Sequence, residues 1–319
     1  MDITGDWRVS NPLSHNGKGV RALCTPGCAV SYCNSGDYLG SGRAGCTTRP
    51  QYKFQKISVE IAENCIARCL ALSLSIVIRV ESLVKTFPGV RAVDGVTFET
   101  RDGQVFGLLG PNGAGKTTTI RLILSILKPD SGRIFVGDVD VLQDGARARS
   151  MIGAVLEDNG VYDRLTAFEN VAIFGEMYGL DRSTLKERVD RLFDLLELNE
   201  VREKKAGSFS KGMKQKIAVA RALVSDPPVL ILDEPTSGLD VLTKRTILDL
   251  MKEEKKRGKS ILYSTHIMSE AEEICDVIAI IHHGQIRAIG TLQELRKQTG
   301  KEKLEDIFIE IVREPYEPS

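Results

Sequence analysis

The chain has 319 residues, of which 42% are hydrophobic and 27% charged, the profile of an ordinary globular protein with one large domain or two modest ones. Lysine plus arginine and aspartate plus glutamate number 43 each, so the overall charge gives no argument for nucleic-acid binding. The longest apolar run, residues 69–78, is too short to span a bilayer, and the start "MDITGDW" does not resemble a secretory signal.

The first 75 residues differ in composition from the rest of the chain. Residues 1–75 are rich in Gly, Ser, Asn and Cys and lack hydrophobic periodicity, which predicts a poorly structured extension or upstream sequence translated from a misplaced start codon. Cys24, Cys28, Cys33 and Cys46 leave a zinc site open, although their spacing differs from the common C-x₂-C pairs.

From residue 76 onward, apolar strand patterns alternate with amphipathic helix patterns. In chain order the predicted elements are strands at 76–87, 92–100 and 104–110, a helix at 116–127, a strand at 133–141, helices at 189–198 and 217–224, a strand at 229–235, a helix at 242–259, and strands at 260–266 and 277–286. This alternation predicts an α/β fold with a largely parallel sheet covered on both faces.

The stretch "GPNGAGKT" fits the phosphate-binding pattern G-x-x-x-x-G-K-[ST], and it lies between a predicted strand and a predicted helix, as that pattern requires. Glycines let backbone N–H groups curl around phosphate oxygens, and the helix N-terminus adds partial positive charge. A lysine here reaches the β- and γ-phosphates, and the hydroxyl after it is offered to Mg²⁺. The predicted nucleotide-binding residues are Gly110, Pro111, Asn112, Gly113, Ala114, Gly115, Lys116, Thr117 and Thr118.

Two acidic residues, Asp233 and Glu234, end the apolar strand pattern "VLILDEP" at the edge where α/β sheets place their ligands. Asp233 suits the shell of a Mg²⁺ ion, and Glu234 suits a base that takes a proton from an attacking water. The alternative is a pair of surface acids at a strand end, which the neighbouring phosphate loop disfavours.

Residues 78–300 resemble the ATP-binding subunit of ABC transporters, because the run "KGMKQKIAVARALVSDPPVLILDEPTSGLD" contains several motifs of that family in the family's order and spacing. The resemblance implies a P-loop NTPase core with a mostly parallel sheet flanked by helices, an antiparallel β subdomain and an α-helical subdomain at about 158–215. It therefore predicts an ATPase domain at 76–300, followed by a short helix and tail at 301–319.

The resemblance also implies roles for further residues. His266 matches the switch histidine that contacts the γ-phosphate, and Asp240 lies in the loop that crosses the dimer interface. Phe87 matches the aromatic residue that stacks on adenine; the alternative is a core or turn aromatic. Glu157 stands where the family has a glutamine that binds Mg²⁺, and the alternative is an exposed loop acid.

Ser210 and Gly212, in "FSKGMKQK", match the serine and second glycine of the family motif "LSGGQ". In the family this helix end faces ATP bound by the other subunit of a head-to-tail dimer, whereas the residues alone favour a plain helix cap with a solvated basic face. Lys211 and Met213 depart from the usual motif and resemble exporter ATPases whose membrane subunits are separate chains.

The sequence therefore predicts an ATP- and Mg²⁺-dependent ATPase subunit of a multi-chain exporter, bound at the cytoplasmic face through multi-spanning membrane subunits. Candidates for the groove that receives those subunits, or else for subdomain core, are Tyr162, Leu165, Phe174 and Met177. The alternative is a soluble ABC ATPase acting on nucleic acid or ribosomes. No coiled-coil insertion, second ATPase half or basic stripe favours that alternative, and no nucleic-acid partner is expected.

Overall fold

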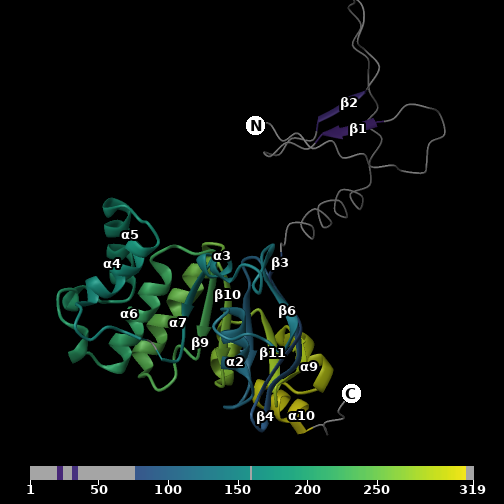
Figure 1. Ribbon diagram of the computed structural model, residues 1–319. Helices are drawn as coiled ribbons and strands as arrows, with labels where there is room; N and C mark the ends of the chain where they lie inside the picture. Colours follow the sequence, from purple (N-terminus) through teal and green to yellow (C-terminus); the bar gives the residue numbers. More distant parts are fainter. Residues whose placement is uncertain (1–19, 24–30, 35–75, 159, 314–319) are drawn as a thin grey trace, which may run out of the picture. The chain divides into compact units, whose positions relative to one another are not determined.

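The computed structural model describes residues 20–23, 31–34, 76–158 and 160–313, and the chain divides into two units, residues 1–59 and 60–319. In the first unit, β1 (Val20–Leu23) and β2 (Ser31–Asn34) form an antiparallel pair (Figure 1). Cys33 lies in β2, whereas the other three cysteines of the zinc prediction lie outside the described residues, so that prediction stays open.

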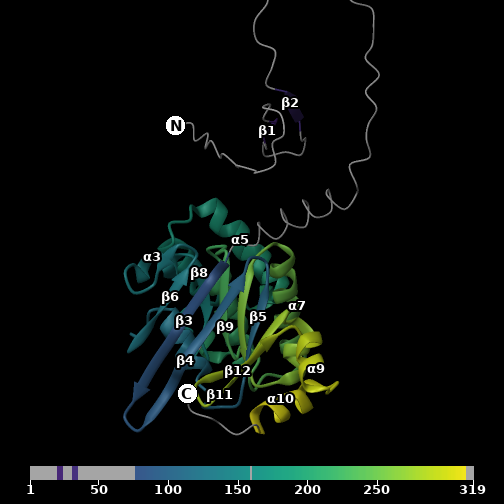
Figure 2. The same cartoon turned by 90° about the vertical axis from the view of Figure 1, so that its right-hand side faces the viewer.

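In the larger unit, the strands predicted at 76–87, 92–100 and 133–141 form an antiparallel sheet (Figure 2). Its strand order is β4-β3-β6-β7, with bounds β3 (Ile76–Phe87), β4 (Val90–Arg101), β6 (Ser131–Val136) and β7 (Val139–Asp140). Buried and exposed residues alternate along much of β4, because successive side chains of a strand point to opposite faces. Phe98 on the buried face stacks on Phe106, with ring centroids 5.0 Å apart, which joins this sheet to the next one.

The second sheet is the predicted, mostly parallel one, in the order β12-β11-β5-β10-β9-β8. The strands are β5 (Val105–Leu109), β8 (Ile152–Val155), β9 (Val229–Asp233), β10 (Ser260–Thr265), β11 (Val277–His282) and β12 (Gln285–Gly290). All its pairs are parallel except β11 with β12. Every residue of β5, β9 and β10 is buried, which explains the apolar runs in these strands. The buried polar residues among them are Asp233, Ser260, Ser264 and Thr265.

Helices pack against this second sheet and at both ends of the larger unit. They are α2 (Lys116–Ile123), α3 (Gly145–Ser150), α6 (Lys211–Leu223), α7 (Val241–Lys256), α8 (Met268–Ile274), α9 (Leu292–Thr299) and α10 (Leu304–Arg313). The pattern predicted α2 to continue to residue 127, but Leu124 caps it and Ser125 adopts a positive φ of 55°. Of the helices that the structure describes, none is long and apolar enough to cross a bilayer.

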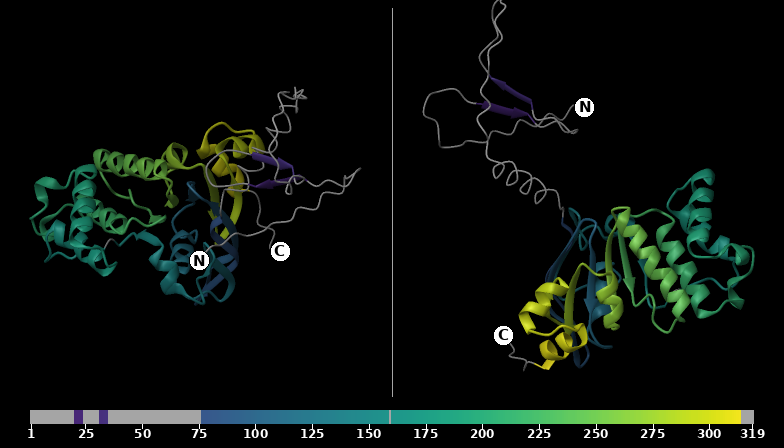
Figure 3. Two further views of the ribbon diagram at one scale, coloured as in Figure 1. Left: turned by 90° about the horizontal axis from the view of Figure 1, so that it is seen from above. Right: turned by 180° about the vertical axis from the view of Figure 1, so that it is seen from behind.

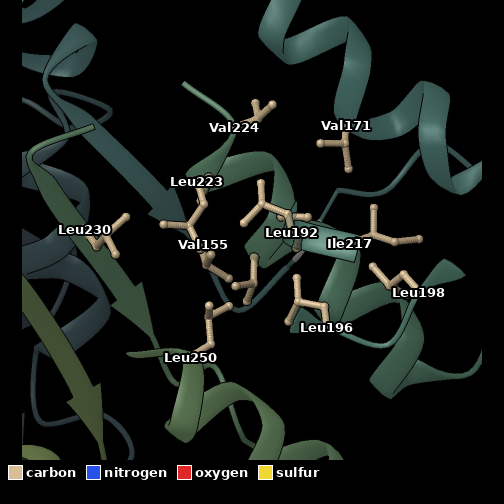
Figure 4. Packing of buried hydrophobic residues seen from close by; sticks show 14 of the residues in the cluster. Val155, Val171, Leu192, Leu196, Leu198, Ile217, Leu223, Val224, Leu230 and Leu250 are labelled. Carbon is tan, nitrogen blue, oxygen red and sulfur yellow. The ribbon is translucent and has the colours of Figure 1, made fainter. Parts of the chain in front are cut away.

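A helical segment with α4 (Ala167–Met177) and α5 (Arg182–Leu195) lies at one end of the larger unit, and α9 and α10 lie at the opposite end (Figure 3). α4 begins with a capping box, because the Thr166 and Glu169 side chains each accept a hydrogen bond from the other residue's backbone N–H. One apolar core joins this segment to the sheet, through residues such as Leu192, Ile217 and Leu230 (Figure 4). α6 therefore packs the helical segment against the sheet. This helix extends beyond residue 215, the predicted end of the helical subdomain.

Candidate functional site

The loop Gly110–Thr117 joins the end of β5 to the start of α2, in the context that the phosphate-binding pattern predicted. Gly115 is the N-cap of α2 with φ 106°, a conformation that residues with a Cβ rarely adopt. A Cβ at Gly115 would lie 2.4 Å from the carbonyl oxygen of Ala92, and a Cβ at Gly110 would lie 2.3 Å from that of Ile281. Glycine therefore allows the tight curl that brings backbone N–H groups to the N-terminus of α2.

A pocket of about 500 Å³ lies over this loop. It brings together nine of the predicted site residues, namely Phe87, Asn112, Gly113, Gly115, Lys116, Thr117, Thr118, Glu157 and Glu234. The other three lining residues are Val90, Ala92 and Ser237, of which Ser237 begins the loop "SGLD" that contains Asp240. Val90 and Ala92 were not predicted from the sequence. Val90 pairs with Phe87 across the β3–β4 turn, so the hairpin pattern indicated its position. Nothing local in the sequence marks Ala92.

Glu234, which lines the pocket, contacts both the lysine of the loop and the predicted switch histidine. Lys116 Nζ lies 3.0 Å from Glu234 Oε1, and His266 Nδ1 lies 3.0 Å from Glu234 Oε2. The Lys116 side chain is 4% exposed and also donates to the carbonyl oxygens of Gly110 (2.8 Å) and Pro111 (3.1 Å). Buried charges must be paired, so these contacts account for a cation in this position.

The backbone of Glu234 is held in an uncommon conformation, with a positive φ of 47°. Its N–H donates to the carbonyl oxygen of Ser264 at 3.2 Å and to Ser264 Oγ at 3.1 Å. Such strained residues persist only where the surroundings hold them and are concentrated at functional sites. The neighbouring β10 therefore fixes the direction in which the Glu234 carboxylate points.

Asp233 lies one residue earlier, at the end of β9, and is completely buried. Its Oδ1 accepts a hydrogen bond from Ser264 Oγ at 2.6 Å, but its buried Oδ2 has no hydrogen-bond partner among the described residues. A buried carboxylate oxygen without a donor fits a cation or a water shell of a cation. No group of three or more His, Cys, Asp and Glu gathers in the described part of the chain.

Phe87 ends β3 at the rim of the pocket, and 38% of its surface is exposed. Lys85 Nζ lies 5.7 Å from the centre of its ring. Glu157 follows β8 and is an exposed residue that also lines the pocket. An open aromatic face and a carboxylate thus border the same pocket, as a purine and a cation bound to phosphate would require.

Ser210, Gly212 and Asp240 do not line this pocket. Ser210 is the N-cap of α6, and its Oγ accepts from Met213 N–H at 3.2 Å, so the predicted cap geometry is confirmed. Asp240 is the N-cap of α7. The backbone N–H of Thr243, and after it the Thr243 hydroxyl, donate hydrogen bonds to the Asp240 carboxylate and lower its pKa. A Cβ at Gly212 would lie 3.0 Å from Thr243 Oγ1, so the two helix N-termini touch each other within one chain.

The basic face of α6 is mostly paired. Lys214 Nζ lies 2.6 Å from Asp163 Oδ1, and Lys216 Nζ lies 2.9 Å from Glu197 Oε2. His282 and His283 lie at the β11–β12 turn, with ring centroids 4.0 Å apart.

The surface of the helical segment exposes several of the apolar residues predicted for a docking groove. Met177 is 75% exposed and Tyr162 is 52% exposed, whereas Leu165 and Phe174 are partly buried. Phe174 borders a groove of about 250 Å³ between the helical segment and the sheet, together with Leu124, Ile126 and Tyr178.

Comparison with known proteins shows the family to which the chain belongs. The ABC transporter family model matches residues 93–237. The ABC transporter ATP-binding protein NatA of Bacillus subtilis is 40% identical over 69% of this chain and 90% of that protein, and the Nod factor export ATP-binding protein I of Ralstonia nicotianae is 38% identical over 69% and 68%. A solved ATP-binding subunit of an ABC transporter is 33% identical with a TM-score of 0.69, covering 74% of this chain and 99% of the other. This chain therefore belongs to the ABC transporter ATP-binding subunits, a family of ATP hydrolases.

Proposed function

We propose that the chain hydrolyses ATP for a multi-chain ABC exporter, as one of two subunits that close head to tail at the cytoplasmic face of the membrane. The observation that carries the proposal is the composition of the pocket. Lys116, Thr117 and Glu234 line it, but the helix end with Ser210 and Gly212 does not. A second subunit would supply that helix end and complete the site.

Lys116 and the N-terminus of α2 would hold the phosphates, and Phe87 would stack on the base. Thr117, Asp233 and Glu157 would hold Mg²⁺, which supplies positive charge against the charge that develops on the phosphate oxygens. The unpartnered Oδ2 of Asp233 supports this assignment.

Hydrolysis would use the chain of contacts around Glu234. A bound phosphate competes with Glu234 for Lys116 Nζ, which now lies 3.0 Å from Oε1. Once released from the lysine, the carboxylate can take a proton from the attacking water, an effect typically worth ~10²–10⁴ in rate. His266, at 3.0 Å from Oε2, would keep the carboxylate directed toward the water and reach the γ-phosphate.

Membrane subunits would dock on the groove beside Ile126, Phe174 and Tyr178. Met177, which precedes Tyr178 in the chain, adds a further exposed apolar side chain. Exposed apolar side chains bordering a groove are typical of protein interaction sites. The named export function of one relative supports an exporter over a soluble ATPase that acts on nucleic acid. Met177→Glu should therefore weaken co-purification with a multi-spanning membrane protein, and unchanged co-purification would contradict this docking site.

The shared site can be tested by mixing two inactive variants in an ATPase assay. Lys116→Ala and Ser210→Arg should each abolish turnover alone, whereas the exposed surface variant Ser150→Arg should not. In a mixed dimer, one site keeps both Lys116 and the facing Ser210, so part of the activity should return on mixing. Absence of recovery would contradict the shared site, and a fully active Ser210→Arg protein would return Ser210 to a plain helix cap.

A further inference from the structure

A buried carboxylate lies directly behind the catalytic pocket without lining it. Glu270, in the first turn of α8, is 5% exposed. Its Oε2 accepts three hydrogen bonds, from Thr236 Oγ1 at 2.7 Å, Tyr263 OH at 2.9 Å and Thr265 Oγ1 at 3.2 Å. The nearest cation is Lys244 of α7, whose Nζ lies 3.8 Å from Oε1. Glu270 is therefore held mainly by neutral hydroxyl groups.

The three donors are themselves buried, with exposures of 1% for Thr236, 0% for Tyr263 and 2% for Thr265. Placing a carboxylate among buried groups is unfavourable unless its lone pairs are satisfied. A network in which one acceptor serves three donors is rigid, because moving any donor leaves a buried polar group unpaired. Burial and the charge of Glu270 raise the pKa of Tyr263 far above its usual range, so its hydroxyl stays a donor.

Two of the donors flank the residues proposed to act in hydrolysis. Thr265 directly precedes His266, and its Oγ1 also accepts from the N–H of Ile267 at 3.0 Å, so it holds the backbone on both sides of the histidine. Thr236 follows Glu234 by two residues. Its carbonyl oxygen accepts from the N–H of Leu239 at 3.2 Å.

We propose that Glu270 is a positioning residue, which sets the distance between Glu234 and His266 by holding Thr236 and Thr265 on a single oxygen. The segments that carry the base and the histidine come from different strands, β9 and β10, and are joined at this oxygen. The same contact fixes the start of the loop with Ser237, which lines the pocket. The inference rests on the proposed roles of Glu234 and His266.

The test removes one hydroxyl at a time in the full chain. Thr265→Val and Thr236→Val keep the side-chain volume and lose the bond to Glu270, whereas Thr265→Ser and Thr236→Ser keep the hydroxyl. We expect the valine variants to lower kcat by ~10–100-fold, since small displacements of catalytic groups have effects of this size. The KM for ATP should stay unchanged, because neither residue lines the pocket, and the serine variants should recover most of kcat.

A merely structural role predicts a different result. Thr299→Val, which removes a distant hydroxyl bonded to the carbonyl of Leu295, serves as the control for lost stability. The inference is overturned if kcat falls only in proportion to the folded fraction measured by thermal unfolding, if KM rises instead, or if both valine variants keep the kcat of the wild type.

A second background separates this inference from the proposed function. Adding Thr265→Val to Glu234→Gln should cause little further loss, because residues that act as one unit are not additive. Full activity of Glu234→Gln would contradict the role of Glu234 as the base. It would also contradict the inference that Glu270 positions that base. An inactive Glu234→Gln together with a normal Thr265→Val and Thr236→Val would overturn only the role of Glu270.

Discussion

Lys116 Nζ lies 3.0 Å from Glu234 Oε1, so the cation of the phosphate loop and the proposed base are paired inside one pocket. Under the proposed function, the carboxylate would become available as a base only when a phosphate replaces it at the lysine. Nucleotide binding would then activate the water, and this proposal makes specific predictions for each partner.

Glu234→Gln should lower kcat by ~10²–10⁴, because an amide cannot take the proton from water. Nucleotide affinity should rise, since the phosphate no longer competes with a carboxylate for Lys116. Turnover and equilibrium ATP binding measure the two effects separately. Glu305→Gln, which changes an exposed glutamate on α10, should alter neither. Undiminished hydrolysis by Glu234→Gln would remove Glu234 from the role of base.

Phe87→Ala should raise the KM for ATP while leaving kcat nearly unchanged. The proposed stacking of the ring on adenine would be equally strong in the ground state and in the transition state. Loss of one base–aromatic stack is worth about 1–3 kcal/mol, so KM should rise by roughly 5- to 150-fold. Phe87→Tyr keeps the stacking face and should behave as the wild type. An unchanged KM in Phe87→Ala would show that the adenine of ATP binds elsewhere.

Asp233→Asn should raise the Mg²⁺ concentration needed for half-maximal ATPase activity by about tenfold or more, since altering the groups around a bound metal typically has an effect of this size. The bond from Ser264 Oγ to Oδ1 can persist in the amide, so the fold is expected to survive. Thermal unfolding without metal checks this point. An unchanged Mg²⁺ dependence would argue that the free Oδ2 has another purpose.

A fourth prediction concerns stability in acid. Partial burial raises the pKa of Asp226, but the hydrogen bond and charge of Lys259 outweigh it, so the folded-state pKa lies below 3.8. Lys259 is 6% exposed and its Nζ lies 2.5 Å from Asp226 Oδ1. A depressed carboxyl pKa stabilises the protein above the unfolded-state value, and that contribution is lost as the pH falls through the folded-state value.

Asp226→Asn should therefore lower the free energy of unfolding by about 1 kcal/mol near neutral pH, where the wild-type ion pair is intact. The difference between wild type and variant should shrink as the pH falls below the unfolded-state pKa and through the folded-state pKa. Urea unfolding at several pH values measures it. A difference that stays constant with pH would mean that the aspartate contributes through packing rather than charge.

The contiguous parts of the site were predictable from sequence because their geometry is local. A strand, a glycine-rich loop and a helix N-terminus place phosphate-binding N–H groups within a few residues, and Gly110 to Thr117 encode that unit by themselves. Ser210 as a helix cap is equally local, and the structure confirms it. The alternation of apolar strands and amphipathic helices was sufficient for the parallel sheet. The zinc prediction falls mostly outside the described residues.

Other features depend on the packing of strands that are distant in sequence. No local pattern states that β10 lies between β5 and β9, yet this order puts Ser264 beside Asp233 and His266 beside Glu234. The pocket contact of Ala92 also follows from neighbours across the fold. The sequence by itself determined the phosphate loop, the acidic strand end and the family. Only the tertiary structure decided which groups meet, including the three hydroxyls on Glu270, because hydrogen bonds between distant segments are set by strand order and register.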